Sequence, residues 1–130
     1  MSPAWIVLAA LDGAALVVLG AAGGHGVITE PALIRLFDTA ADYQAWHMLA
    51  LLGIGFGGGR LFGAAKWLIS AAGAAFLVGS ALFCGSLYVH ALSGSAPLPW
   101  AAPIGGTIMI LGWVALAAAG LALLRARSAD

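Results

Sequence analysis

Long apolar stretches separated by short polar or glycine- and proline-rich breaks dominate this chain. Hydrocarbon about 30 Å thick is crossed by roughly 20 apolar residues of α-helix. Helices are expected because backbone polar groups in lipid must be satisfied within their own segment. Four such segments lie at about residues 3–23, 43–58, 66–92 and 100–124. The pattern predicts an all-α fold, an integral membrane bundle of four transmembrane helices in a single domain, residues 1–130.

The third and fourth segments form one uncharged stretch from Lys66 to Arg125. This stretch is too long for one crossing of a bilayer. Residues 93–99 read SGSAPLP, and glycine and proline favour a turn. We therefore expect two helices joined by this turn.

Residues 27–42 are amphipathic, and they precede the second apolar segment. Thr29 could cap a helix, and Pro31 suits a first helical turn. Apolar positions then share one face and charged positions another; these are Leu33, Leu36, Phe37 and Ala40 against Arg35, Asp38 and Asp42. The pattern fits a short interfacial helix between the first two spans. It fits equally well a solvated helix that leads directly into the second span.

Composition supports a lipid environment. Hydrophobic residues make up 63% of the 130 positions and charged residues only 8%, whereas a soluble domain is about half apolar and roughly a quarter charged. The net charge of zero gives no reason to expect a nucleic-acid partner. The single cysteine, Cys84, excludes an internal disulfide. Membrane lipid is the expected partner.

The basic residues predict the orientation of the chain. With four spans, both termini and the middle loop share one side of the membrane. That side would carry Arg60, Lys66, Arg125 and Arg127, and the other side only Arg35. Because basic residues are enriched in cytoplasmic loops, we expect both termini to be cytoplasmic.

Six polar residues are expected to gather at the outer end of the bundle. Polar side chains within a membrane face protein or a water-filled cavity, and they suggest a functional site. The candidate binding residues are His25, Tyr43, Gln44, His47, Ser86 and His90.

Three interpretations of this group remain open. The polar groups could form interhelical hydrogen bonds that close the bundle. They could line a pocket for a small amphipathic ligand, such as a quinone headgroup or a lipid. Alternatively, His25, His47 and His90 could bind a metal, with Cys84 nearby. No two of these histidines have the short spacing of recognised zinc motifs.

Asp12 interrupts the first apolar segment roughly 12 Å below the membrane boundary. An ionised carboxylate near the bilayer centre costs on the order of 3 kcal/mol. We therefore expect a protonated acid that makes one structural hydrogen bond, with the indole of Trp113 or with Ser70. The alternative is a small proton-coupled transporter that acts through Asp12 as an oligomer.

Pairs of glycines four residues apart let membrane helices approach closely. Three such pairs occur, Gly20/Gly24, Gly53/Gly57 and Gly55/Gly59. They predict close packing within the bundle, and they make a homo-oligomer or a larger membrane complex plausible.

Four ordered blocks of sequence resemble the YgdD-like (transmembrane protein 256-like) membrane protein family, domain of unknown function 423. The blocks are residues 20–26 (GAAGGHG), 43–50 (YQAWHMLA), 82–88 (LFCGSLY) and 102–113 (APIGGTIMILGW). The resemblance implies a four-helix protein of the bacterial inner (plasma) membrane, and it supplies no activity.

The chain departs from the family pattern at several positions. Cys84 stands where the pattern has serine, and Ala102 stands where it has threonine, while Asp12 and His90 lie outside it. No role for Asp12, Cys84 or His90 therefore follows from the resemblance.

The sequence contains no nucleophile–base pair, phosphate-binding loop or paired carboxylates, so we do not expect an enzyme. We expect a non-catalytic accessory or lipid- or small-ligand-binding subunit. The alternatives are the transporter and a metal- or redox-handling membrane protein. No particular cofactor is indicated.

Overall fold

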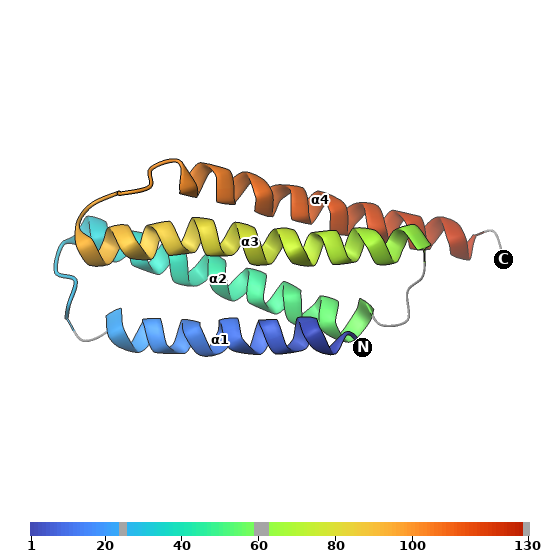
Figure 1. Cartoon of the computed structure of the whole chain (residues 1–130), viewed down its shortest axis with the longest axis horizontal. Coiled ribbons are helices and arrows are strands. Elements are labelled where there is room, and N and C mark those ends of the chain that lie inside the picture. The colour runs from blue at the N-terminus through green and yellow to red at the C-terminus, as the bar shows by residue number, and fades with distance from the viewer. Residues whose placement is uncertain (24–25, 59–62, 129–130) are drawn as a thin grey trace.

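The computed structural model describes residues 1–23, 26–58 and 63–128. Its four helices are α1 (Pro3–Gly23), α2 (Pro31–Gly57), α3 (Gly63–Ser93) and α4 (Ala101–Arg127). They run alongside one another in an elongated bundle (Figure 1), and the described part of the chain contains no strand. The expected all-α bundle is confirmed.

Three of the helices, α1, α3 and α4, are long and apolar enough to cross a membrane. The exception is α2, which carries Gln44 and His47 near its middle. This helix packs against both α1 and α3, and the two polar side chains are buried. These two polar residues therefore face protein, as expected for polar groups within a membrane bundle. Arg35, Asp38 and Asp42 on the first turns of α2 also reduce its hydropathy, and they are exposed.

The segment before Tyr43 belongs to α2. Residues 31–42 form the first turns of this helix and continue into Tyr43 without a break, so the separate interfacial helix is wrong. The N-cap is Glu30 rather than Thr29, and the N–H of Ile34 donates to its carbonyl oxygen at 3.0 Å. Pro31 at the start of the helix loses no intrahelical hydrogen bond there.

The early start of α2 changes the position of its polar residues. Gln44 lies about 20 Å along the helix from Pro31, because an α-helix rises 1.5 Å per residue. The sequence interpretation placed Gln44 and His47 at the outer end of the bundle. The structure places them near mid-length, at the level of Asp12 on α1.

The helices α3 and α4 approach each other closely at two glycines. A Cβ atom at Gly79 would lie 2.8 Å from the carbonyl oxygen of Gly105, and one at Gly105 would lie 2.7 Å from that of Gly79. Only glycine allows the two backbones to lie this close. On the other side of the bundle, a Cβ atom at Gly55 would lie 2.6 Å from the side chain of Ile6, where α2 crosses α1.

Three of the four described glycines of the four-residue pairs do not make such contacts. Gly20, Gly53 and Gly57 have no atom within 4 Å of an added Cβ, and Gly24 and Gly59 lie outside the described residues. The spacing of glycines shows that they share a face of a helix. It does not show which face meets another helix.

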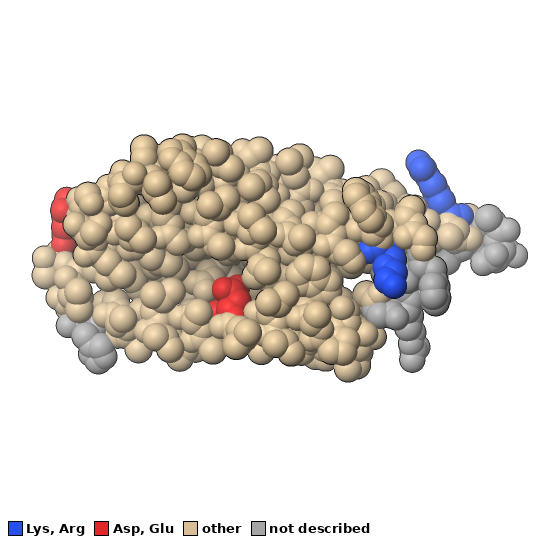
Figure 2. Space-filling view, viewed as in Figure 1, with Lys and Arg blue, Asp and Glu red and all other residues tan. Residues whose placement is uncertain are grey.

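Both termini lie at one end of the bundle, and the connections α1–α2 and α3–α4 lie at the other (Figure 1). Lys66 near the start of α3 and Arg125 near the end of α4 belong to the terminal end, where basic side chains are visible in Figure 2. Arg35 lies on the first turns of α2, at the opposite end. Arg60 lies outside the described residues, as does the side chain of Arg127.

Candidate functional site

Gln44 connects three helices near the middle of the bundle. Its Nε2 donates to Oδ1 of Asp12 on α1 at 2.8 Å and to the backbone oxygen of Asp12 at 3.2 Å. The hydroxyl of Tyr88 on α3 donates to Gln44 Oε1 at 2.9 Å. Both Gln44 and Tyr88 are only 6% exposed. The amide therefore links α1, α2 and α3 through three hydrogen bonds.

The expected partners of Asp12 were wrong. The indole N–H of Trp113 donates to His47 Nε2 at 3.2 Å, and Ser70 lines a pocket at the terminal end beside Met1. Counting depth along separate helices suggested the pairing of Asp12 with Trp113. However, α1 packs on α2 whereas α4 packs on α3, so Trp113 meets Phe76 of α3, with 4.8 Å between the ring centroids, and His47 of α2 rather than Asp12 of α1.

The ring of His47 is held by hydrogen bonds on both nitrogens. Its Nδ1 lies 2.7 Å from the backbone oxygen of Tyr43. A carbonyl oxygen can only accept, so Nδ1 carries the hydrogen, while Nε2 accepts from Trp113. The ring also packs edge-on against Phe76, with 5.3 Å between the centroids. This arrangement fixes a neutral imidazole in one tautomer, and it orders the contact between α2 and α4.

The structure does not bring His47 and His90 together. His90 lies about 20 Å along α3 from Phe76, the residue that packs on His47. A shared metal site of these two histidines is therefore wrong, and His25 lies outside the described residues. Within residues 1–23, 26–58 and 63–128, no three His, Cys, Asp or Glu side chains are placed to hold a metal ion.

A cavity of about 170 Å³ lies beside Asp12, between α1, α2 and α3. We call it the Asp12 cavity. Oδ2 of Asp12 is buried, and no group in the described part of the chain hydrogen-bonds to it. The remaining walls are Leu19, Gln44, Leu77, Ser80, Ala81, Cys84, Gly85 and Tyr88.

Sequence reasoning missed Ser80 and Tyr88 as parts of this region. Together with Cys84 they are spaced four residues apart on α3, which puts all three on one face. Ser80 Oγ lies 3.5 Å from Cys84 Sγ. A polar stripe on an otherwise apolar membrane helix was the signal that could have identified them.

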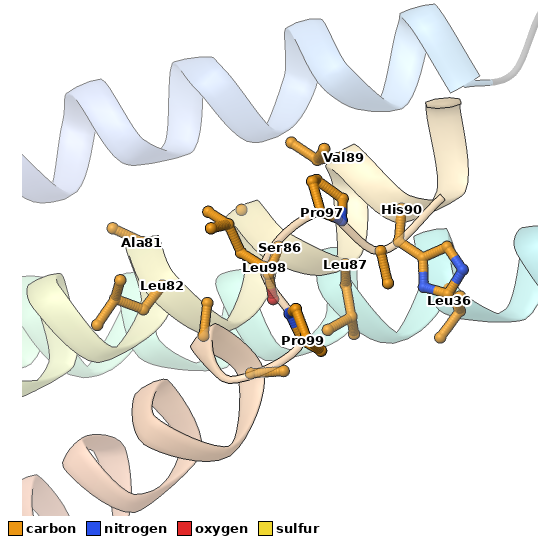
Figure 3. A pocket seen from close by; sticks show the side chains of 14 residues that line it. Leu36, Ala81, Leu82, Ser86, Leu87, Val89, His90, Pro97, Leu98 and Pro99 are labelled. Atoms are coloured by element: carbon orange, nitrogen blue, oxygen red, sulfur yellow. The ribbon is translucent and has the colours of Figure 1, made fainter. Parts of the chain in front are cut away.

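A larger cavity, about 420 Å³, lies at the end of the bundle where α3 connects to α4. We call it the outer pocket. Apolar side chains from α2, α3, α4 and the connection form most of its wall, with Ser86 and His90 as its polar side chains. Figure 3 shows His90 beside Leu36 at one end of the pocket, and Ala81 and Leu82 at the other.

Backbone geometry positions the two polar groups of the outer pocket. Gly94 ends α3 with a φ of 70°, and its N–H donates to the carbonyl oxygen of His90 at 2.9 Å, a common way to end a helix. The hydroxyl of Ser86 donates to the carbonyl oxygen of Phe83 at 2.8 Å. No hydrogen bond joins the His90 ring to any other group in the described ranges.

The six candidate residues therefore do not form one site. Gln44 and His47 are buried near mid-length, and Ser86 and His90 line the outer pocket. Tyr43 is 45% exposed, and its ring packs 5.0 Å from that of Phe83. The sixth residue, His25, lies outside the described residues.

Comparison with known proteins gives the family. Residues 19–106 match the model of a family described as protein of unknown function (DUF423). A UPF0382 membrane protein from Haemophilus influenzae is 36% identical over 119 residues, which is 90% of this chain and 93% of that protein. A UPF0382 membrane protein from Schizosaccharomyces pombe is 32% identical over 117 residues, 84% of this chain and 94% of that protein.

A further relative is the UPF0382 membrane protein YwdK from Bacillus subtilis, 29% identical over 119 residues, with 90% of this chain and 95% of that protein covered. No solved structure matches the chain. The family match covers more than half of the chain, and the relatives are named as membrane proteins, in agreement with the apolar helices. The chain therefore belongs to the DUF423 family, as its four sequence blocks indicated.

Proposed function

We propose that this protein is a non-catalytic membrane protein that binds a small amphipathic ligand in the outer pocket. The proposal rests on an apolar cavity of about 420 Å³ that is lined by the imidazole of His90. This imidazole makes no hydrogen bond to any other group among the described residues. Ligand pockets are commonly about 300–1,000 Å³, mostly apolar, with a few polar groups that orient the ligand.

The chemistry of the wall defines the ligand class. An N–H of His90 can donate to an oxygen on the head of a ligand, and the Ser86 oxygen retains lone pairs because its proton goes to Phe83. Leu36, Leu82 and Leu98 provide apolar contact for the body of the ligand. The pocket suits an apolar molecule with an oxygen-bearing head, which is the shared chemistry of quinones and lipids.

The proposal includes the location of the protein. We place it in the bacterial inner membrane with both termini in the cytoplasm. The orientation is supported by Lys66 and Arg125 at the terminal end and by Arg35 at the opposite end. The outer pocket would then lie near the periplasmic interface, where a ligand can keep its head near water and its body in lipid.

The test is to identify what stays bound to the purified protein. Wild type, His90→Ala, Ala102→Phe and Val114→Ala are purified in a mild detergent and extracted with organic solvent. Quinone is measured by its redox difference spectrum and lipid by mass spectrometry, so the two sources are distinguished. Ala102 lines the pocket, whereas Val114 is 61% exposed on α4 and serves as the control.

One ligand is expected at near-stoichiometric amounts in wild type and in Val114→Ala. It should be lost from His90→Ala, which removes the donor, and from Ala102→Phe, which fills the pocket. Native mass spectrometry of the same samples reports the oligomeric state. A wild-type protein that retains neither molecule, or a ligand that remains after both pocket substitutions, would refute the proposal.

A further inference from the structure

The polar groups that line the Asp12 cavity mainly have free acceptor atoms, because most of their donors already make hydrogen bonds. Oδ2 of Asp12 is buried without a donor from the described residues. Tyr88 gives its single O–H to Gln44, and Gln44 Nε2 makes both of its hydrogen bonds to Asp12. A molecule that entered this cavity would have to bring its own donors.

An ionised Asp12 would also lack a counterion in this region. The basic residues Arg35, Lys66 and Arg125 belong to the ends of the helices, far from mid-length. The nearest imidazole, His47, uses one nitrogen to donate and the other to accept, so it is neutral in this arrangement. Nothing basic in the described ranges pairs with Asp12, and an ionised carboxyl would need a cation from outside the chain.

The rest of the wall is apolar and accessible from the side of the bundle. Leu19 of α1 and Leu77 of α3 line the cavity together with the polar groups. Figure 2 shows an acidic group in a hollow near mid-length, the level at which α1 carries Asp12. At this depth the surrounding medium is hydrocarbon, so a ligand must be soluble in lipid to reach the cavity.

We propose that the Asp12 cavity binds the ammonium group of a lipophilic primary amine. An alkylammonium ion has three N–H donors and no acceptor, which complements the carboxyl, the Tyr88 oxygen and the Ser80 oxygen. Hydrogen bonds between an ammonium and a carboxylate are among the strongest in proteins. The hydrocarbon tail packs on Leu19 and Leu77. This site is separate from the proposed ligand in the outer pocket and does not depend on it.

Three small probes of equal chain length separate the parts of this proposal. Octylamine carries both charge and N–H donors, octanol has one neutral donor, and octyltrimethylammonium has charge but no N–H. Binding to the full-length protein in lipid nanodiscs is measured by calorimetry. The carboxyl carbons of labelled aspartates are followed by NMR, with the Asp12 signal assigned from the Asp12→Asn spectrum. Asp42→Asn is the matched control, because Asp42 is exposed and does not line the cavity.

Octylamine is expected to bind wild type and Asp42→Asn alike, and at least about tenfold more weakly to Asp12→Asn, as for the loss of one charge-assisted hydrogen bond. Octanol and octyltrimethylammonium should bind wild type at least about tenfold more weakly than octylamine. Unchanged octylamine affinity in Asp12→Asn overturns the proposal, and so does a wild-type affinity for octanol or octyltrimethylammonium that equals the affinity for octylamine.

Wild type alone also provides a decisive measurement if Asp12→Asn does not fold. The Asp12 carboxyl signal, then assigned as the aspartate signal most protected from a paramagnetic agent in water, should shift on addition of octylamine and stay in place with octanol. An Asp12 signal that does not respond to octylamine overturns the proposal without any variant.

Discussion

The amide of Gln44 donates a 2.8 Å hydrogen bond to the carboxyl of Asp12, 32 residues away in the sequence. Ala9 is the only described residue of α1 that is buried, so few side chains hold this helix in place. A polar contact near its middle, together with the approach of Ile6 to Gly55, fixes how α1 lies along α2.

Replacing Gln44 with leucine should destabilise the bundle by about 1–3 kcal/mol, because the substitution leaves Asp12 and Tyr88 without their buried partner. Unfolding in a detergent titration measures the effect. Thr107→Ala is the control, since the exposed Thr107 hydroxyl bonds only within its own helix, to Pro103; it should change stability by less than about 0.5 kcal/mol. Equal stability of Gln44→Leu and wild type would show that the network is not structural.

Replacing Trp113 with phenylalanine should cost about 1 kcal/mol and release one ring nitrogen of His47. Nitrogen NMR of histidine-labelled protein measures the tautomer directly. In wild type the hydrogen of His47 should be on Nδ1, and the Nε2 signal should move in Trp113→Phe. The control is Trp46→Phe, because Trp46 is 67% exposed. A hydrogen on Nε2 of His47 in wild type would contradict the hydrogen bond in which Trp113 donates to that nitrogen.

The helices could be predicted from the sequence because their apolar stretches match what a lipid environment requires. The residue at which α2 begins could not be predicted in this way. Residues 31–42 have the same amphipathic period whether they form a separate surface helix or the first turns of a span. Only the contacts of Phe37 and Ala40 with α3 residues such as Tyr88 distinguish the two. These contacts are non-local, and the local pattern does not contain them.

The error at the start of α2 spread to the candidate site. A second span that began at Tyr43 would have kept Gln44 and His47 at the surface of the membrane, away from Asp12. Sequence correctly marked Gln44, His47 and Asp12 as polar residues that need partners. It did not determine which partners, because that depends on which helices are neighbours and on their relative shift along the bundle.

Replacing Gly105 with alanine should separate α3 from α4. The added methyl group would lie 2.5 Å from the backbone nitrogen of Phe83 and 2.7 Å from the oxygen of Gly79, and neither backbone atom can move independently. We expect a loss of about 1–3 kcal/mol in the same unfolding titration. Gly106→Ala is a closely matched control, because its methyl group would meet Phe83 at 3.7 Å, an ordinary contact. A Gly105→Ala variant as stable as Gly106→Ala would contradict the close approach.

Cysteine labelling tests the proposed orientation in intact cells. The natural Cys84 is 2% exposed and should not react with a membrane-impermeant maleimide. Ser95 lies in the α3–α4 connection and Ser128 just after α4, and both are exposed at opposite ends of the bundle. Ser95→Cys should label from outside intact spheroplasts, whereas Ser128→Cys should label only after lysis, because the proposed orientation places the terminal end, with Lys66 and Arg125, in the cytoplasm. The reverse pattern would place both termini outside, and labelling of both residues in intact spheroplasts would contradict any orientation in which the bundle crosses the membrane.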